Sequence, residues 1–207
     1  MTTEFIKRII SSIILIGIFL FCYFVHEYAF LFILFLTCII CWIEWVEIIK
    51  KINIKNKILS KLSNIVSFLY ILIFGISIFA FYGDDKILLL NLLFVCIFSD
   101  IGGYVFGKTF GGKKLTKISP NKTISGSVGS FLFSLISYNV YLIYYTNSDL
   151  DITSKHILLP FLFSFVCQLG DLFISYFKRK AKIKDTGKLI PGHGGLLDRI
   201  DGIIFAL

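Results

Sequence analysis

Charged residues are scarce in this sequence of 207 amino acids. They make up 16% of the chain, whereas hydrophobic residues make up 57% and aromatic residues 17%. Soluble globular domains contain about 25% charged residues on average. The scarcity of charge excludes a separate soluble domain, and apolar runs recur along the whole length. The composition therefore predicts an all-α protein, a polytopic bundle of about six transmembrane helices with a short seventh helix at the C-terminus.

Complete zinc, disulfide-redox and Walker-type nucleotide motifs are also missing. Cys38 and Cys41 have C-x-x-C spacing, but they lie inside an apolar run without a second pair or a nearby histidine. We interpret all five cysteines as small apolar side chains. The chain has no Walker A loop, no zinc-ligand spacing and no Ser-His-Asp arrangement. The N-terminus resembles a signal peptide but lacks an A-x-A-like cleavage site, so we expect it to remain as the first span.

Six apolar segments are long enough to cross, or nearly cross, a bilayer, which takes about 20 helical residues. We expect spans at roughly 9–25, 28–49, 64–82, 86–107, 127–145 and 157–177. A seventh apolar segment begins near Ile200 and is too short to span. We divide the chain into N-terminal transmembrane helices, 1–85, and a catalytic transmembrane region, 86–207, with two polar loops on the cytoplasmic side.

Basic residues predict the orientation. With the N-terminus in the cytoplasm, 19 of the 21 lysines and arginines face that side, and only Lys86 and Lys155 lie outside. This agrees with the positive-inside rule and predicts an integral protein of the inner (cytoplasmic) membrane whose active site faces the cytoplasm. The net charge of +8 is explained by this rule and by attraction to anionic lipid headgroups, so we expect no nucleic-acid partner.

Four acidic residues lie within the predicted spans: Glu44, Glu47, Asp100 and Asp171. Ionisable groups at membrane depth are costly and usually mark a functional site. Asp100 and Asp171 each lie about 10–12 Å inside the cytoplasmic edge, on helices that run in the same direction. We expect these two carboxylates to face a polar cavity open to the cytoplasm. The two glutamates lie nearer the edge, and we expect them to pair with Lys50 and Lys51.

Two polar loops carry residues suited to phosphate. GKTFGGKKLTKISPNKTISGS, from Gly107 to Ser127, combines glycines, lysines and hydroxyls. KDTGKLIPGHGGLLDRID, from Lys184 to Asp201, gathers three aspartates, two lysines, an arginine, a histidine and four glycines. Before the second loop, Asp171, Ser175 and Lys178 form a polar stripe at i, i+4 and i+7. Carboxylates beside cations predict a Mg²⁺-dependent phosphoryl or nucleotidyl transferase.

With these residues, the chain resembles the phosphatidate cytidylyltransferases (CDP-diacylglycerol synthases). Their signature, S-x-x-K-R-x-x-x-x-K-D and then P-x-H-G-G-x-x-D-R-x-D, is met at every fixed position by SYFKRKAKIKD (175–185) and PGHGGLLDRID (191–201). SPNKTISG (119–126) is similar to the family element S-P-x-K-T-x-E-G, except that Ser125 replaces the glutamate. The resemblance covers about 90–207. It implies the reaction of CTP with phosphatidate to give CDP-diacylglycerol and pyrophosphate.

The resemblance also implies roles for individual residues. Asp171 and Asp198 would hold Mg²⁺. The remaining phosphate-contacting and polar catalytic residues would be Lys178, Arg179, Lys184, Asp185, His193, Arg199 and Asp201. The substrate-binding residues would be Asp100, Tyr104, Ser119, Lys122, Thr123 and Ser175. Phosphatidate is already ionised at neutral pH, so His193 is not required as a base. The expected partners are CTP and membrane phosphatidate, and a homodimer stays open.

Three alternatives remain. A CTP-dependent kinase of a polyprenol or phytol would share the general plan, but an alcohol would attack the γ-phosphorus and CDP would leave. A transporter would place its acids near the bilayer centre with access from both faces, and no inverted repeat is visible. An inactive relative is the third alternative, because the last helix is short for holding Asp198 and because Ser125 replaces a carboxylate.

Overall fold

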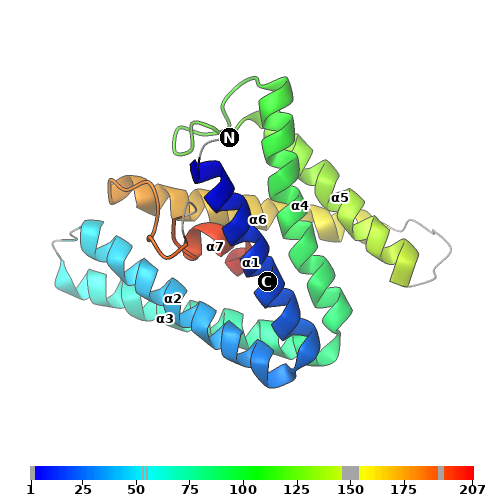
Figure 1. The fold of residues 1–207 in the computed structure, drawn as a ribbon. Coiled ribbons are helices and arrows are strands. Elements are labelled where there is room, and N and C mark those ends of the chain that lie inside the picture. The colour runs from blue at the N-terminus through cyan, green and yellow to red at the C-terminus, as the bar shows by residue number, and fades with distance from the viewer. Residues whose placement is uncertain (1–2, 53, 55, 146–153, 191–193) are drawn as a thin grey trace. The chain divides into compact units, whose positions relative to one another are not determined.

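The computed structural model describes residues 3–52, 54, 56–145, 154–190 and 194–207. This part of the chain contains seven α-helices (Figure 1). Their bounds are α1 Thr3–Val25, α2 Glu27–Ile52, α3 Lys57–Asp84, α4 Lys86–Phe110, α5 Ile124–Tyr145, α6 Ser154–Lys180 and α7 Leu197–Ala206. The only extended pairings among these residues are two isolated β-bridges, Lys114 with Thr123 and Ile190 with Gly194. The predicted all-α class is confirmed.

Five of the helices are long and apolar enough to cross a bilayer, namely α2, α3, α4, α5 and the part of α6 from His156 to Lys180. They coincide with five of the six predicted spans. The first predicted span coincides with α1, whose described apolar part is the shorter stretch Ile14–Val25. Large apolar side chains point outward from these helices; Phe32, for example, is 62% exposed. The chain is therefore an integral membrane protein with multiple spans.

The chain forms two compact units. The first combines residues 1–79 with 177–200, and the second combines 80–176 with 201–207. Both α6 and α7 therefore contribute residues to each unit. Each unit contains its own cluster of polar side chains.

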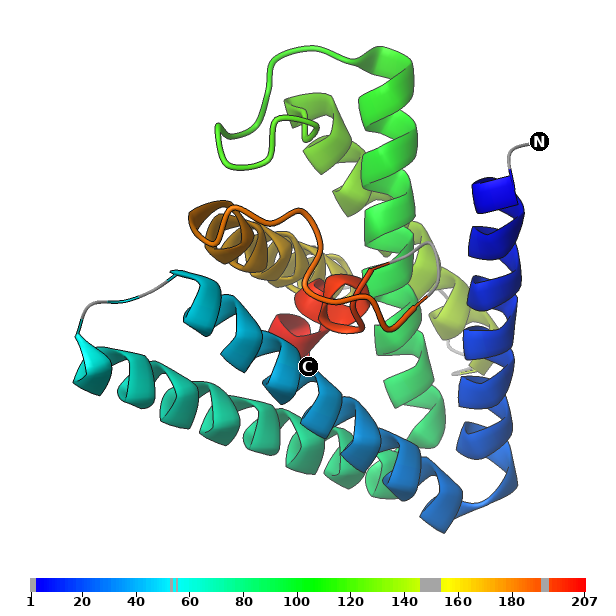
Figure 2. The ribbon, with the colours of Figure 1, turned by 60° about the vertical axis from the view of Figure 1, so that its left-hand side comes forward.

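In the first unit, α2 and α3 run side by side, as both ribbon views show (Figures 1 and 2). The Trp42 indole N–H donates to the Asn64 carbonyl at 3.3 Å, and the Trp42 ring packs edge-on against Phe68. Cys38 Sγ lies 3.8 Å from the Ile71 carbonyl. All five cysteines are free thiols, in agreement with their interpretation as packed side chains.

In the second unit, α4 and α5 approach so closely that glycine is required where they meet. A Cβ atom on Gly126 would lie 2.7 Å from the Gly103 carbonyl oxygen, and one on Gly102 would overlap the Gly129 carbonyl oxygen. Small residues let helix backbones pack in a membrane, where water does not drive apolar surfaces together. Val95, Tyr138 and Leu142 form a buried apolar cluster in the same unit.

Buried polar side chains connect α4, α5 and α6. Ser99 Oγ lies 2.7 Å from Ser164 Oγ, and the Gln168 amide N–H donates to Ser164 Oγ at 3.3 Å. Ser127 Oγ in turn donates to Gln168 Oε1 at 2.6 Å. Polar groups at this depth need partners, and these side chains supply them for each other. Gln168 precedes Asp171 by one turn of α6.

Candidate active site

A polar cavity of about 330 Å³ lies in the second unit among α4, α5, α6 and the loop that joins α4 to α5. Both intramembrane aspartates, Asp100 and Asp171, line it. So do four other residues that the sequence assigned to substrate binding: Tyr104, Ser119, Lys122 and Thr123. The structure thus brings together residues from the SPNKTISG element and from two distant helices.

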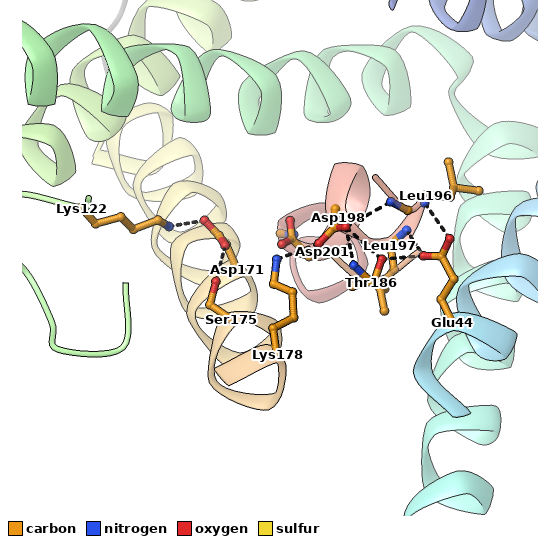
Figure 3. A network of polar contacts seen from close by, with 12 residues as sticks. Glu44, Lys122, Asp171, Ser175, Lys178, Thr186, Leu196, Leu197, Asp198 and Asp201 are labelled. Atoms are coloured by element: carbon orange, nitrogen blue, oxygen red, sulfur yellow. Dashed lines mark hydrogen bonds and ion pairs between the residues drawn. The ribbon is translucent and has the colours of Figure 1, made fainter. Parts of the chain in front are cut away.

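Lys122 and Asp171 form an ion pair in this cavity (Figure 3). Ser175 Oγ donates to the other carboxylate oxygen of Asp171 at 3.2 Å. The Lys122 and Asp171 side chains are 27% and 26% exposed, so both remain accessible from the cavity. A lysine ammonium beside a carboxylate can exchange that partner for a phosphate oxygen, because both are anionic acceptors.

Backbone hydrogen bonds in the α4–α5 loop place Lys122. The Leu115 N–H donates to the Lys122 carbonyl at 2.8 Å, and the Lys122 N–H donates to the Ser119 carbonyl at 3.1 Å. Directly after it, Thr123 Oγ1 accepts from the Gly126 N–H at 3.1 Å and so caps the N-terminus of α5. The loop is therefore a closed turn that leads directly into a capped helix.

Ser125 stands where the related family element has glutamate. Its hydroxyl donates to the Gly111 carbonyl and lies 2.9 Å from Thr123 Oγ1. A carboxylate could accept hydrogen bonds here but could not donate one to a carbonyl. In this chain the position therefore closes the loop onto the end of α4.

The first unit contains a second polar cluster, centred on Asp198. Lys178 Nζ donates to Asp198 Oδ1 at 2.7 Å, and the two side chains are only 12% and 4% exposed. Asp198 Oδ2 accepts from the Thr186 N–H at 2.7 Å, from Thr186 Oγ1 at 3.0 Å and from the Gly195 N–H at 3.1 Å. The Gly195 N–H lies just before α7, so Asp198 satisfies a backbone donor at the start of its own helix.

These contacts determine the protonation state of the Asp198 carboxyl group. Burial alone raises the pKa of this carboxyl. The hydrogen bond and charge of Lys178, together with the N–H groups of Thr186 and Gly195, lower the pKa by more. The pKa of Asp198 therefore lies below its ordinary value, and the side chain is ionised at neutral pH.

The interpretation of Glu44 as an interfacial partner of Lys50 and Lys51 is wrong. Glu44 is 6% exposed and accepts hydrogen bonds from residues far along the chain (Figure 3). Oε1 accepts from the Leu196 N–H at 2.9 Å, and Oε2 accepts from the Leu197 N–H at 2.9 Å and from Thr186 Oγ1 at 2.7 Å. The unpaired N–H groups at the start of a helix attract an anion, and α7 obtains one from α2.

Other predicted residues lie along the same segment. Arg179, Lys184, Asp185 and Arg199 are exposed. Asp201 belongs to the second unit, is 8% exposed and accepts from the Gly202 N–H at 2.9 Å. His193 lies outside the described residues.

Sequence reasoning missed the roles of Glu44, Thr186 and Gln168. Glu44 did carry a signal, because an acid inside a span needs a partner. Nothing in the sequence indicated that the partners would be Thr186 and the amides of Leu196 and Leu197.

The cavity has two carboxylates in its lining, which is the donor type that a hard divalent cation prefers. Asp100 and Asp171 line it together with Ser119, Ser127 and Gln168. Among the described residues, no group of three or more His, Cys, Asp or Glu side chains surrounds one metal position. Mg²⁺ often takes only one or two carboxylates and completes its shell with water and substrate phosphates, so this donor set is suitable.

The fold and these clusters define a class: a polytopic membrane protein with lysine–carboxylate clusters suited to phosphate chemistry. The chain belongs to the Cytidylyltransferase family, whose model matches residues 52–207. It is 39% identical over 140 residues to a phosphatidate cytidylyltransferase of Helicobacter pylori strain J99. The matched region covers 63% of this chain and 50% of that protein.

Two further relatives have the same name. The chain is 39% identical over 137 residues to the phosphatidate cytidylyltransferase of Staphylococcus haemolyticus, covering 64% of this chain and 52% of the relative. It is 43% identical over 136 residues to that of Rickettsia typhi, covering 63% and 60%. The matched region spans about half of each relative's length.

Proposed function

We propose that this protein transfers the cytidylyl group of CTP to phosphatidate, giving CDP-diacylglycerol and pyrophosphate for phospholipid synthesis. The observation that carries the proposal is the membership of residues 52–207 in the Cytidylyltransferase family. Relatives named phosphatidate cytidylyltransferase, about 40% identical to this chain, support the choice of substrates.

The polar cavity supports a role in holding substrate phosphates. Lys122 offers a cation that is paired with Asp171 until an anion replaces the carboxylate. Ser119 and Thr123 add hydroxyls from the same loop. Asp100 and Tyr104 line the cavity from α4. We assign these residues and Ser175 to substrate binding.

The reaction needs charge neutralisation more than it needs a base. An ionised phosphate oxygen of phosphatidate attacks the α-phosphorus of CTP, and a new P–O bond forms. The bond from the α-phosphorus to the bridging oxygen of the β-phosphate breaks, and that electron pair leaves with pyrophosphate. Lys178, Arg179, Lys184 and Arg199 would neutralise the phosphate charges, and Asp185, His193 and Asp201 would complete the polar site.

We assign the Mg²⁺ ligands to Asp171 and, by the family signature, Asp198. A bound Mg²⁺ would neutralise charge on the phosphates of CTP. Asp171 is accessible in the cavity, whereas Asp198 is 4% exposed and its Oδ1 contacts Lys178. For Asp198 to take part, Lys178 has to release that oxygen and turn to a phosphate instead.

The distribution of basic residues supports an inner-membrane protein with its N-terminus and active site on the cytoplasmic side. CTP would then reach the site from the cytoplasm, while phosphatidate stays in the membrane.

The test uses purified protein in liposomes that contain phosphatidate, with Mg²⁺ and CTP labelled either at the α- or at the γ-phosphate. We expect the α-label to enter the lipid fraction with an equal amount of pyrophosphate. Entry of the γ-label with an added lipid alcohol would indicate a kinase instead. No transfer by protein that elutes as a single folded species would refute the proposal.

A further inference from the structure

Glu44 is buried, charged and remote from every sequence motif, yet it contacts the signature segment directly. It lies on α2, 142 residues before Thr186 and more than 150 before Leu196 and Leu197. All of these residues belong to the first compact unit. We propose that Glu44 is a positioning residue, which holds the segments 186–190 and 194–197 in the arrangement that the transfer reaction needs. The inference rests on the proposed function.

The contacts engage both oxygens of the Glu44 carboxylate. Both oxygens accept, from two backbone N–H groups and one hydroxyl, at 2.7–2.9 Å. Neutral glutamine would keep only one acceptor oxygen. In either orientation its NH₂ group would face an N–H donor, from Leu196 or from Leu197. Glutamine has nearly the same size as glutamate, so this change removes the charge and an acceptor without opening a cavity.

Two glycines let the carboxylate approach. A Cβ atom on Gly187 would lie 2.7 Å from Glu44 Oε1, and one on Gly195 would overlap both Glu44 Oε2 and Thr186 Oγ1. Glycine is therefore required at position 195 of the signature, because a larger residue would collide with the Glu44 side chain of α2. Helix α2 thus supplies a side chain that the polar segment surrounds.

Thr186 connects Glu44 to Asp198. Its hydroxyl lies 2.7 Å from Glu44 Oε2 and 3.0 Å from Asp198 Oδ2. A hydroxyl has one proton, so it donates fully to only one carboxylate at a time. Thr186 also donates its N–H to Asp198 at 2.7 Å and is only 1% exposed. A shift of Glu44 would therefore move Thr186, and Thr186 would move the carboxylate of Asp198.

The test compares Glu44→Gln with Glu47→Gln. Glu47 lies on the same helix one turn later and is exposed, so it controls for the loss of one negative charge. Amide hydrogen exchange on the peptide from Gly194 to Ile200 reports the two N–H groups bound by Glu44, whether or not the protein is active. Initial rates with CTP and phosphatidate give kcat and KM separately.

We expect Glu44→Gln to accelerate exchange in this peptide and in the segment 186–190, and to leave exchange elsewhere in the protein unchanged. We also expect kcat to fall about ten- to a hundredfold, because small displacements of catalytic groups cost that much, with KM for CTP changed less than about twofold. Glu47→Gln should match the unmodified protein in both measurements. Glu44→Asp, which keeps two acceptor oxygens on a shorter stem, should recover part of kcat.

Thr186 provides an independent pair of variants. Thr186→Ser keeps the hydroxyl and should behave like the unmodified protein, whereas Thr186→Val keeps the shape and should lower kcat. Glu44→Gln combined with Thr186→Val should be no worse than Glu44→Gln alone, because both changes break the same connection.

Several results would overturn the inference. Unchanged exchange would mean that Glu44 does not hold the segment. Faster exchange with unchanged kcat would mean that the transfer reaction does not depend on Glu44 holding the segment. Loss of protection throughout the protein, with Thr186→Val fully active, would assign Glu44 to general stability. If the unmodified protein transfers no cytidylyl group, the proposed function fails, while the exchange data still decide whether Glu44 holds the segment.

Discussion

The buried pair of Lys178 and Asp198 allows a prediction whose magnitude follows from the structure. Lys178→Met keeps most of the side-chain stem and removes the ammonium that lies 2.7 Å from Asp198 Oδ1. At an effective dielectric constant of about 20, the attraction is about 6 kcal/mol before desolvation. Desolvation costs several kcal/mol per ion, and Asp198 keeps the backbone N–H donors of Thr186 and Gly195. We expect a net loss of about 2–3 kcal/mol in the free energy of unfolding.

Thermal unfolding in detergent measures this loss. For a chain of this length, each kcal/mol corresponds to about 2–4 °C in Tm, so Lys178→Met should unfold about 4–12 °C lower. Lys188→Met is the matched control, because Lys188 is exposed on the same polar segment. If both variants unfold within about 1 °C of the unmodified protein, the pair does not stabilise the fold and our reasoning is refuted.

The same pair predicts a pH dependence. The pKa of Asp198 is lowered in the folded protein, so its stabilising contribution is complete above the unfolded pKa of about 4. The contribution is lost as the pH falls through the folded pKa. The difference in Tm between the unmodified protein and Lys178→Met should therefore stay constant from pH 8 to pH 5. It should narrow only below about pH 4.

Three further predictions concern the second unit. Asp171→Asn should lower cytidylyl transfer at least about a hundredfold while the protein still inserts into the membrane, because the carboxylate proposed to bind the metal is lost; near-normal transfer would rule out the metal role. Lys122→Met should raise KM for CTP more than it lowers kcat, and an unchanged KM would remove Lys122 from nucleotide binding. Gly129→Ala would place a methyl group 2.6 Å from the Gly102 carbonyl oxygen and should cost about 1–3 kcal/mol of stability. Gly83→Ala, where the Cβ would meet open space, should leave Tm unchanged.

Glu44 illustrates how sequence reasoning can identify an unusual residue and still assign it the wrong partner. Lys50 and Lys51 follow within two helical turns, and a local ion pair was the simplest expectation. In the folded protein, Glu44 is buried and accepts hydrogen bonds from two N–H groups at the start of α7. These N–H groups need an acceptor where water is scarce. A partner more than 140 residues away cannot be found from the periodicity of one helix.

The class and the family of this protein can be predicted from its amino-acid sequence. Runs of about 20 apolar residues are enough to predict membrane helices, because the length of a span depends only on bilayer thickness and helix rise. The signature from Ser175 to Asp201 identified the residues of the polar segments without any knowledge of their positions in space.

The contacts between these residues become visible only in the folded chain. The Lys122 ammonium lies beside Asp171, and the Lys178 ammonium lies beside Asp198. The sequence offers each lysine several candidate acids and does not indicate which one it contacts. The folded chain also shows that glycines on α4 and α5 pack against each other and that Gly195 packs around Glu44. The physical reason is that hydrogen bonds and close packing join residues by distance in space, and chain folding sets that distance independently of sequence separation.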